Sequence, residues 1–402
     1  MRFHEIPPRQ FAALAAGGGG PEAAAILVAA QHSKHVLLLC GVVHAAETAG
    51  HHEALAARRG YELLARVQRS DPAAVAAVIR YPSVGAWAYR TLTALRGGPK
   101  FPGAAPGYLA TVAATAAIRA GIVPGIDVPG MDVPRVNGLV VLPSLGAGEL
   151  GTAGWREVRG LRVVLNMPGG DMVADDVDPF RMPAAPHVAQ AADLTGWPEM
   201  FRGAWRLLER GHPEVAAEVA AMIKVVVPLR RPAHGQASSS SPETFGAIAT
   251  SEPVDPVTLA VTLTHETQHV KLSALLDLVS LTKPDDGSRY YAPWRDDPRP
   301  ASGLLQGTYA YLGVTGFWRR MRQETETTVV MTQFARWRSA AASGAQTLLS
   351  SGQLTTAGTE FVRGITATLA GWQREPVSAT ARAEAADANA RHHAAWQARN
   401  GS

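Results

Sequence analysis

Two histidines and a glutamate in residues 265–269, which read His-Glu-Thr-Gln-His, are the side chains of this sequence best suited to chemistry. In a helix, His265 and His269 lie on nearly one face, about 6 Å apart along the axis, so both imidazoles can reach one metal ion. Glu266 then lies beside the first histidine, where it can handle a proton. The pattern is expected by chance only about 0.02 times in a chain of this composition. A helix with coincidental polar residues is the alternative, but the flanking residues are apolar, and unpaired polar groups are costly there.

A metal ion on these two imidazoles needs a third protein ligand, which we expect from the helix that follows the next loop. No histidine lies between His269 and His392, so a third imidazole is not available there. The candidates that this segment offers are Gln306, Tyr309, Tyr311, Glu324 and Glu326. The two glutamates would supply charge, but they also fit a solvated helix face. The pattern therefore leaves the third ligand open.

The identity of the ion decides the reaction. Zinc would activate water with Glu266 as general base, as in a metallopeptidase. Iron(II) would leave positions for 2-oxoglutarate and dioxygen, as in an oxygenase. An oxygenase also needs a cationic clamp for the dicarboxylate, and Arg295 and Arg299 in the loop between the two helices are suited to bidentate carboxylate binding. Alternatively, the two arginines pair with Asp296 and Asp297 and only stabilise the loop.

The elements that must position these residues indicate an α+β protein, predominantly helical, with a small central β region and a zincin-like metal-binding helix in the C-terminal half. Asp255 is a plausible N-cap of that helix, with Pro256 at its first position. We expect three regions: a helical region over 1–121, a β-containing region with a following helix over 122–228, and a metal-site region over 229–402. The last region should contain the motif helix 256–281, an arginine loop 290–300 and a second helix 304–341.

Shorter segments between these elements carry further expectations. Residues 139–142 and 161–166 predict strands. A single helix is expected from Trp197 to Val225, and the acidic segment that follows residue 170 predicts an exposed turn. Residues 235–241, Gly-Gln-Ala-Ser-Ser-Ser-Ser, have the composition of a linker.

An alternative applies to the same serine-rich stretch. Residues 245–250 predict a strand, and a strand just before a metal-binding helix can form an active-site edge for an extended peptide. In that interpretation His234, Gln236 and the serines line the site. The scattered histidines at positions 32, 35, 44, 51 and 52 are expected to be ordinary surface or core residues.

Composition narrows the class of protein. The chain has 402 residues, 47% of them hydrophobic and 18% charged, as is typical of a soluble globular protein. Its net charge is only +4 and it has no dense basic run, which argues against nucleic-acid binding. Cys40 is the single cysteine, so internal disulfides and multi-cysteine zinc sites are excluded. The charged, proline-containing N-terminus does not fit a signal peptide, and the longest apolar run, about 36–43, is too short to span a bilayer. We therefore expect a cytoplasmic protein that binds no membrane.

Three stretches together resemble a known family. They are residues 235–241, residues 259–276 (Leu-Ala-Val-Thr-Leu-Thr-His-Glu-Thr-Gln-His-Val-Lys-Leu-Ser-Ala-Leu-Leu), and residues 291–314, which contain Tyr-Ala-Pro-Trp-Arg-Asp-Asp-Pro-Arg-Pro. They are similar to the HExxH motif domain family, 2-oxoglutarate-dependent HExxH-type peptide β-hydroxylases of clusters that mature ribosomally made peptides. The resemblance implies Fe(II) on His265 and His269, 2-oxoglutarate as cosubstrate, and hydroxylation at the β-carbon of a residue in a precursor peptide. It also implies a radical-SAM maturase as a possible partner.

One departure from the family concerns the third ligand. The family reads Tyr-Ala-His in the helix after the arginine loop, and the resemblance implies that this histidine is the third ligand. Here the sequence is Tyr309-Ala310-Tyr311. We expect Tyr311 to take that place, although a tyrosinate ligand needs its pKa of ~10 lowered by the metal. A zinc metallopeptidase and a peptide-binding protein with an impaired metal site remain alternatives.

Overall fold

The computed structural model describes residues 4–122, 139–151, 154–183, 188, 193–233 and 235–401. About 60% of the structure is helical, with 13 helices in its described part and two small sheets in the middle region, which confirms the α+β expectation. The chain divides into two compact units built from separate segments. Unit 1 comprises Met1–Leu27, Met200–Met222 and Val254–Ser402, and unit 2 comprises Val28–Glu199 and Ile223–Pro253. The three regions expected at 1–121, 122–228 and 229–402 are continuous stretches, whereas the chain passes between the two units several times.

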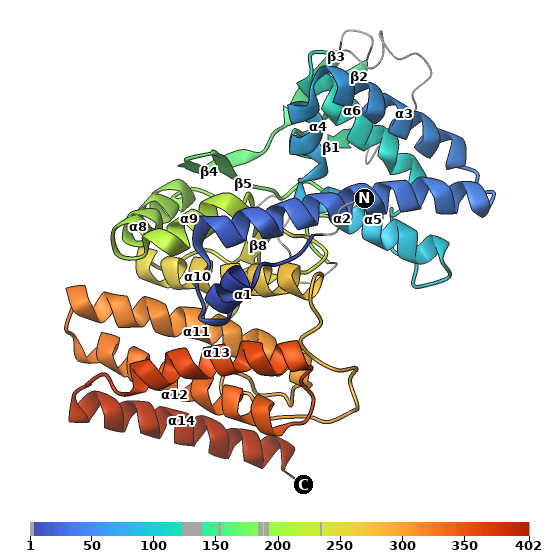
Figure 1. Ribbon diagram of the computed structural model, residues 1–402. Helices are drawn as coiled ribbons and strands as arrows, with labels where there is room; N and C mark the ends of the chain where they lie inside the picture. Colours follow the sequence, from blue (N-terminus) through green and yellow to red (C-terminus); the bar gives the residue numbers. More distant parts are fainter. Residues whose placement is uncertain are drawn as a thin grey trace. The chain divides into compact units, whose positions relative to one another are not determined.

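Unit 1 contains the motif helix and the helices that pack around it. Figure 1 shows the C-terminal helices, coloured orange to red, stacked next to the motif helix α10. Helix α10 contacts α9 and α11, α11 contacts α12, and α12 contacts both α13 and α14. The bounds are α1 Pro8–Ala15, α8 Trp197–Gly211, α9 Pro213–Met222, α10 Pro256–Leu276, α11 Ala301–Glu324, α12 Thr328–Ser350, α13 Thr356–Gln373 and α14 Ala379–Asn400.

The start of the motif helix is set by two residues, as expected from the sequence. The Asp255 side chain accepts a hydrogen bond from the Thr258 backbone N–H at 2.8 Å, which satisfies one of the free donors of the first turn. Pro256 occupies the first helical position. The helix ends at Leu276, one turn before the expected position 281.

Two of the expected long helices are each broken in two. The expected helix 304–341 is wrong, because α11 ends at Glu324 and α12 begins at Thr328. The backbone of Thr325 is extended, and the side chain of Thr327 caps α12 by accepting a hydrogen bond from Val330 N–H. These two threonines therefore lie in the break between the helices. The expected helix 197–225 is likewise divided at Pro213, which begins α9, because a proline disfavours helical geometry in the residue before it.

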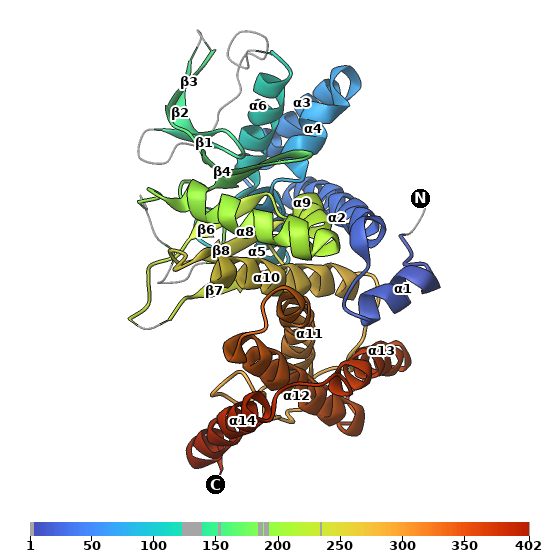
Figure 2. The ribbon, with the colours of Figure 1, turned by 90° about the vertical axis from the view of Figure 1, so that its left-hand side faces the viewer.

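Unit 2 holds the two sheets. The first is an antiparallel arrangement of β1 (Val140–Leu142), β2 (Gly146–Gly151) and β3 (Gly154–Arg159). The second has the order β4-β5-β6-β8-β7, with parallel pairing only at β5–β6 and β6–β8, and Figure 2 labels β4, β6, β8 and β7. Its strands are β4 Arg162–Met167, β5 Gly170–Ala174, β6 Val225–Pro228, β7 Ser238–Ser240 and β8 Ala247–Thr250. The strands expected at 139–142 and 161–166 are confirmed.

The serine-rich segment is a strand and not a linker. Ser238–Ser240 form β7 and pair with β8 in antiparallel register. The strand expected at 245–250 exists as β8, but it lies between β6 and β7, so its backbone has no free edge for a peptide. Gln236 donates a hydrogen bond to Thr250 Oγ1 at 2.9 Å. His234 lies outside the described residues.

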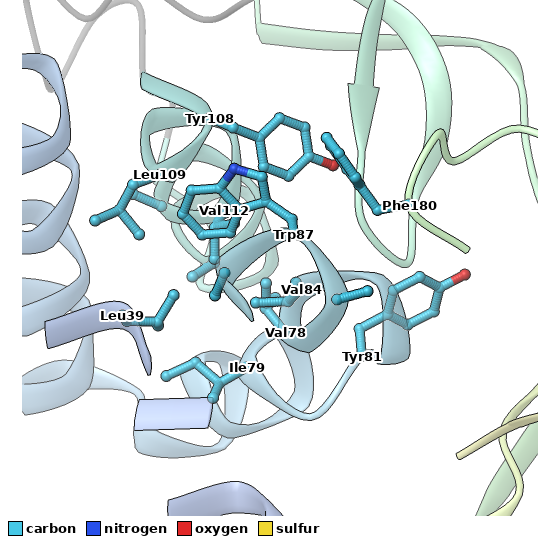
Figure 3. Packing of buried hydrophobic residues seen from close by; sticks show 14 of the residues in the cluster. Leu39, Val78, Ile79, Tyr81, Val84, Trp87, Tyr108, Leu109, Val112 and Phe180 are labelled. Carbon is cyan, nitrogen blue, oxygen red and sulfur yellow. The ribbon is translucent and has the colours of Figure 1, made fainter. Parts of the chain in front are cut away.

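The core of unit 2 is formed by helices and closed by aromatic rings. The ring of Tyr108 packs between those of Trp87 and Phe180 (Figure 3). Its centroid lies 5.2 Å from that of Trp87 and 5.0 Å from that of Phe180. Trp87 Nε1 donates to the Ala105 carbonyl, which satisfies the one polar atom of this buried side chain. The helices are α2 Gly20–Thr48, which begins in unit 1, α3 Ala54–Ser70, α4 Pro72–Ile79, α5 Pro82–Leu95, the 3₁₀ turn η1 Pro106–Tyr108 and α6 Leu109–Arg119.

In the acidic segment after residue 170, Asp171 is exposed but Asp175, Asp176 and Asp178 are buried, so the expected exposed turn is wrong for these three. Asp175 accepts a hydrogen bond from Tyr81 Oη at 2.6 Å, and Asp178 accepts one from Ser83 Oγ at 2.6 Å. Burial and the neighbouring Asp175 raise the pKa of Asp178 to about 7. The hydroxyl groups of Tyr81 and Ser83 are distant in sequence from the two aspartates. Their hydrogen bonds satisfy the carboxyl groups inside the core.

One helix in the described part of the chain, α2, is long and apolar enough to cross a membrane by length and composition alone. Its most apolar window has a mean hydropathy of 1.5 and is 33% buried. Core helices of soluble proteins and signal sequences share these properties. The cytoplasmic location expected from the sequence therefore stays a prediction.

Candidate metal centre

His265 and His269 lie close together on α10. Their Nε2 atoms are 3.1 Å apart, and their rings meet edge to face with centroids 4.8 Å apart. Two ligand nitrogens that each lie ~2.1 Å from an ion can be at most ~4.2 Å apart. The two nitrogens are therefore close enough to bind one ion. The spacing of four residues brings the imidazoles together, as the sequence indicates.

Burial keeps the first imidazole in the form that binds metals. Burial, and to a smaller extent the neighbouring His269, lower the pKa of His265 to about 3. The imidazole is then neutral near pH 7 and has a free electron pair on one nitrogen. Metal ions bind this neutral form, so no proton has to leave His265 before an ion binds.

Gln306 of α11 orients the second imidazole. His269 Nδ1 donates to Gln306 Oε1 at 3.0 Å, while Gln306 Nε2 donates to Ser273 Oγ at 3.3 Å. A proton on Nδ1 leaves the electron pair of His269 on Nε2, the atom that faces His265. Gln306 was one possible third ligand, but its amide oxygen already accepts from the imidazole. Its position is that of a residue that holds a ligand in place.

Tyr311 lies against the histidine pair inside an aromatic cage. Its ring centroid is 5.2 Å from that of His265, and it packs between Trp294 at 4.8 Å and Trp337 at 4.3 Å. Burial raises the pKa of Tyr311 to about 12. The phenol is therefore protonated in the metal-free protein, and it can bind as tyrosinate only if an ion displaces that proton. Coordination by Tyr311 stays a prediction.

The remaining candidates for the third ligand lie away from the pair. Tyr309 is fully buried against Phe361, with ring centroids 5.4 Å apart, and beside the ammonium of Lys271. Glu324 lies at the far end of α11, near Gly211, and Glu326 is exposed in the break before α12. Of the five side chains considered, only Gln306 and Tyr311 therefore contact the two histidines.

Glu266 is buried, with 2% of its surface exposed. It is close enough to Tyr311 for its charge to raise the pKa of that phenol, against the lowering effects of Arg336 and Arg295. The carboxylate and two guanidinium groups are thus within electrostatic range of the tyrosine beside the histidine pair. This charge arrangement distinguishes the site from a purely apolar histidine pair.

The arginine loop is held together by one carboxylate. Arg295 Nε donates to Asp297 Oδ1 at 2.6 Å, and Arg299 Nη1 donates to Asp297 Oδ2 at 3.0 Å. These hydrogen bonds hold the pKa of Asp297 at about 2. Asp296 pairs instead with Arg399 of α14 at 2.5 Å. These ion pairs are of the kind expected if the arginines only stabilise the loop. A carboxylate ligand would have to compete with Asp297 for either arginine.

The C-terminal helix supplies side chains to the same region, which sequence reasoning missed. Tyr291 of the loop lies 2.8 Å from His392 Nδ1 and contacts the rings of His393 and Trp396. Arg336 of α12 was also missed, because a single helix was expected over 304–341. A signal was present in the adjacent pair Arg336-Trp337, a combination that suits cation–π contact.

A different group of potential ligands lies in unit 2. The side chains of His51, His52 and Glu53 place their ligand atoms within 4.8 Å of one another, the one such group of three His, Cys, Asp or Glu residues in the described ranges. Glu53 accepts from Gly107 N–H at 3.0 Å, and His51 Nδ1 accepts from Glu53 N–H at 3.1 Å. These atoms stabilise the turn before α3, in line with the ordinary role expected for His51 and His52.

A scan against protein-family models gives no match for the sequence, and a search of curated proteins finds none that is similar to it.

Proposed function

We propose that the protein is an Fe(II)/2-oxoglutarate-dependent oxygenase that hydroxylates the β-carbon of a residue in a ribosomally made precursor peptide. One observation carries the proposal: the Nε2 atoms of His265 and His269 lie 3.1 Å apart, beside a tyrosine that is within electrostatic range of Arg295 and Arg336. A dicarboxylate cosubstrate needs cationic groups next to its metal, whereas hydrolysis of a peptide bond does not.

The donor set fits iron(II). Imidazole and oxygen ligands suit this ion, and His265, His269 and Tyr311 would hold it. When bound, iron(II) would supply the activation of dioxygen. Gln306 holds His269 through Nδ1 so that Nε2 faces His265, and the rings of Trp294 and Trp337 pack against Tyr311. Glu266 orients a water molecule or the substrate and need not act as a hydrolytic base.

The setting of the reaction follows from the same proposal. The substrate is a precursor peptide encoded beside the gene, in a cluster that can also contain a radical-SAM maturase. The protein works in the cytoplasm, with neither nucleic acid nor membrane as a partner. The lone cysteine and the low net charge support this setting.

The test is to incubate the protein with Fe(II), 2-oxoglutarate and the peptide encoded beside its gene, and to measure the peptide by mass spectrometry. The proposal requires the mass of one oxygen atom to be added, with consumption of 2-oxoglutarate and with loss of the reaction in H269A. Cleaved peptide without cosubstrate consumption would contradict it. A zinc metallopeptidase would then be indicated, with E266Q expected to abolish the cleavage.

A second candidate function is peptide binding without catalysis. The raised pKa of Tyr311, about 12, favours it, because a protonated phenol is a poor metal ligand. Metal analysis after anaerobic loading with Fe(II) separates the two functions. A bound ion supports the oxygenase, and protein that recovers no ion supports the binding protein.

A further inference from the structure

Arg336 lies in the second layer of side chains around the histidine pair. Its guanidinium lies over the ring of Trp337, 4.5 Å from the centroid. The Trp337 ring packs on Tyr311 at 4.3 Å, and the Tyr311 ring lies 5.2 Å from that of His265. Two aromatic rings thus connect the cation of α12 to the candidate ligands of α10.

The side chains around Arg336 include a carboxylate, Asp296, whose charge acts to raise the pKa of His392 but which forms its ion pair with Arg399. Asn389 of α14 donates to the Arg336 carbonyl at 3.3 Å, which brings α14 against this turn of α12. Arg336 is close enough to His392 and Tyr291 to lower the pKa of both side chains. Burial dominates each pKa, lowering that of His392 and raising that of Tyr291, so both side chains are uncharged at neutral pH.

The guanidinium of Arg336 is half-buried. Within the described part of the chain no carboxylate forms an ion pair with it, and its Nε is buried without a hydrogen-bond partner. Arg338, two residues along the same helix, differs: its Nη1 donates to the carbonyls of Trp372 and Glu375, both at 2.8 Å. A half-buried cation with an unsatisfied donor is costly unless an anion binds to it.

We infer that Arg336 is the carboxylate-binding residue of the site, and that its ligand is the distal carboxylate of a small dicarboxylic 2-oxo acid. The inference rests on the proposed function and replaces Arg295 and Arg299 as the expected clamp. Both of those arginines form ion pairs with Asp297, whereas Arg336 forms none with a carboxylate in the described part of the chain. The ring of Trp337 lies against one face of the guanidinium and fixes its plane.

The test measures binding, so it does not depend on turnover. Succinate and 2-oxoglutarate are titrated by calorimetry into the full chain, both metal-free and loaded with Fe(II) without oxygen. Succinate has the two carboxylates but not the 2-oxo group, so it reports the carboxylate site alone. We expect R336Q to weaken binding about ten- to a hundredfold, the usual effect of losing a hydrogen bond to a charged group.

Matched variants separate the role of Arg336 from a general loss of charge. R336K keeps the charge but loses the fork, so it should weaken binding by a smaller factor, and it remains informative if R336Q does not fold. Arg391 is exposed on α14 next to His392, and R391Q should bind within about twofold of the unmodified chain. R295Q removes a guanidinium that already donates to Asp297, so it should weaken binding by a smaller factor than R336Q does.

The outcomes are distinct. A larger loss of binding in R336Q than in R295Q supports the inference. Unchanged binding in both R336Q and R336K would overturn it. A loss of binding in R295Q as large as that in R336Q would also overturn it. If the unmodified chain hydroxylates its peptide while R336Q binds 2-oxoglutarate normally, the proposed reaction stands without this role for Arg336. If R336Q loses succinate binding but no peptide is hydroxylated, the carboxylate site stands without the proposed reaction.

Discussion

Gln306 contacts His269 through Nδ1, the ring nitrogen that does not face the other histidine. Loss of a partner of this kind commonly lowers metal affinity by about ten- to a hundredfold. We expect Q306A to show such a loss of Fe(II) affinity, measured anaerobically by competition with a chelator. Q346A, which alters an exposed glutamine of α12, is the control and should bind iron like the unmodified chain. Equal affinities for Q306A and Q346A would contradict the role of Gln306.

At the level of residues, the sequence predicted the proximity of the two histidines but not the side chains packed around them. The spacing of His265 and His269 forces them onto one helix face, so their proximity could be predicted from helix geometry. The roles of Gln306 and Arg336 could not be predicted, because they depend on how α11 and α12 pack against α10. The sequence allows the loop arginines to pair with Asp296 and Asp297. In the structure both arginines pair with Asp297, which the sequence alone could not show.

At the level of elements, a buried ion pair holds the motif helix. Lys271 Nζ lies 2.8 Å from Glu218 Oε2 of α9 and also donates to the carbonyls of Gly17 and Gly18. Both side chains are almost completely buried. Glu218 Oε1 accepts from Gly20 N–H at 2.9 Å. The pair therefore joins three separate chain segments next to the histidines.

Removal of the lysine alone should destabilise the protein strongly. K271M leaves Glu218 buried without its counter-charge, and we expect a loss of about 3–5 kcal/mol in the free energy of unfolding, measured with urea at pH 7. The double variant E218Q/K271M buries no charge and keeps an acceptor for Gly20 N–H, so it should lose less. A double variant as unstable as the sum of the two single variants would contradict the coupling.

His212, at the junction of α8 and α9, should make stability depend on pH. Burial, with a smaller effect of Arg320, lowers the pKa of His212 to about 4, and its ring stacks on Phe317 at 4.4 Å. Between about pH 6.5 and pH 4, His212 binds a proton in the unfolded chain, where its pKa is near 6.5, but not in the folded protein. The free energy of unfolding therefore decreases as the pH falls through this range. Between pH 7 and pH 5 the free energy of unfolding should fall by about 1–2 kcal/mol more in the unmodified chain than in H212F.

The control for this pH dependence is H52Q, because His52 is exposed. Its pH dependence should match that of the unmodified chain. If H212F loses as much stability on acidification as H52Q does, His212 is not the group responsible.

Element boundaries could be predicted where a local cap decides them. Asp255 and Pro256 set the start of α10, and Asp71 caps α4 by accepting from Ala74 N–H at 2.9 Å. The break between α11 and α12 was missed, since threonines in a long helical pattern do not by themselves end a helix. The serine strand was missed because β7 is stabilised by its pairing with β8 and not by its own composition.

At the level of the whole molecule, each compact unit is assembled from distant parts of the chain. The segment Val254–Ser402 contains the histidine pair, but Glu218 and the loop at Gly17–Gly20 come from elsewhere in unit 1. Composition and patterning predicted the α+β class, because helical periodicity and β-rich runs are local. They did not predict this assembly, which depends on long-range packing.

A fragment of residues 254–402 should therefore not fold by itself. It would bury Lys271 without a counter-charge and expose the faces of α10 and α13 that α9 and α1 cover. We expect a broad, non-cooperative thermal transition by circular dichroism, in contrast to the full chain. A fragment with a cooperative transition at the temperature of the full chain would contradict this assembly.

The central claim is that His265 and His269 hold an iron(II) ion to which 2-oxoglutarate binds. The most direct measurement is the visible absorption of the full chain with Fe(II) and 2-oxoglutarate in the absence of oxygen, because a 2-oxo acid chelated to iron(II) gives a charge-transfer band. The expected result is a band that saturates at one equivalent of Fe(II) and is missing in H265A and H269A. A band that is absent from the unmodified chain, or that persists in both variants, would contradict the claim.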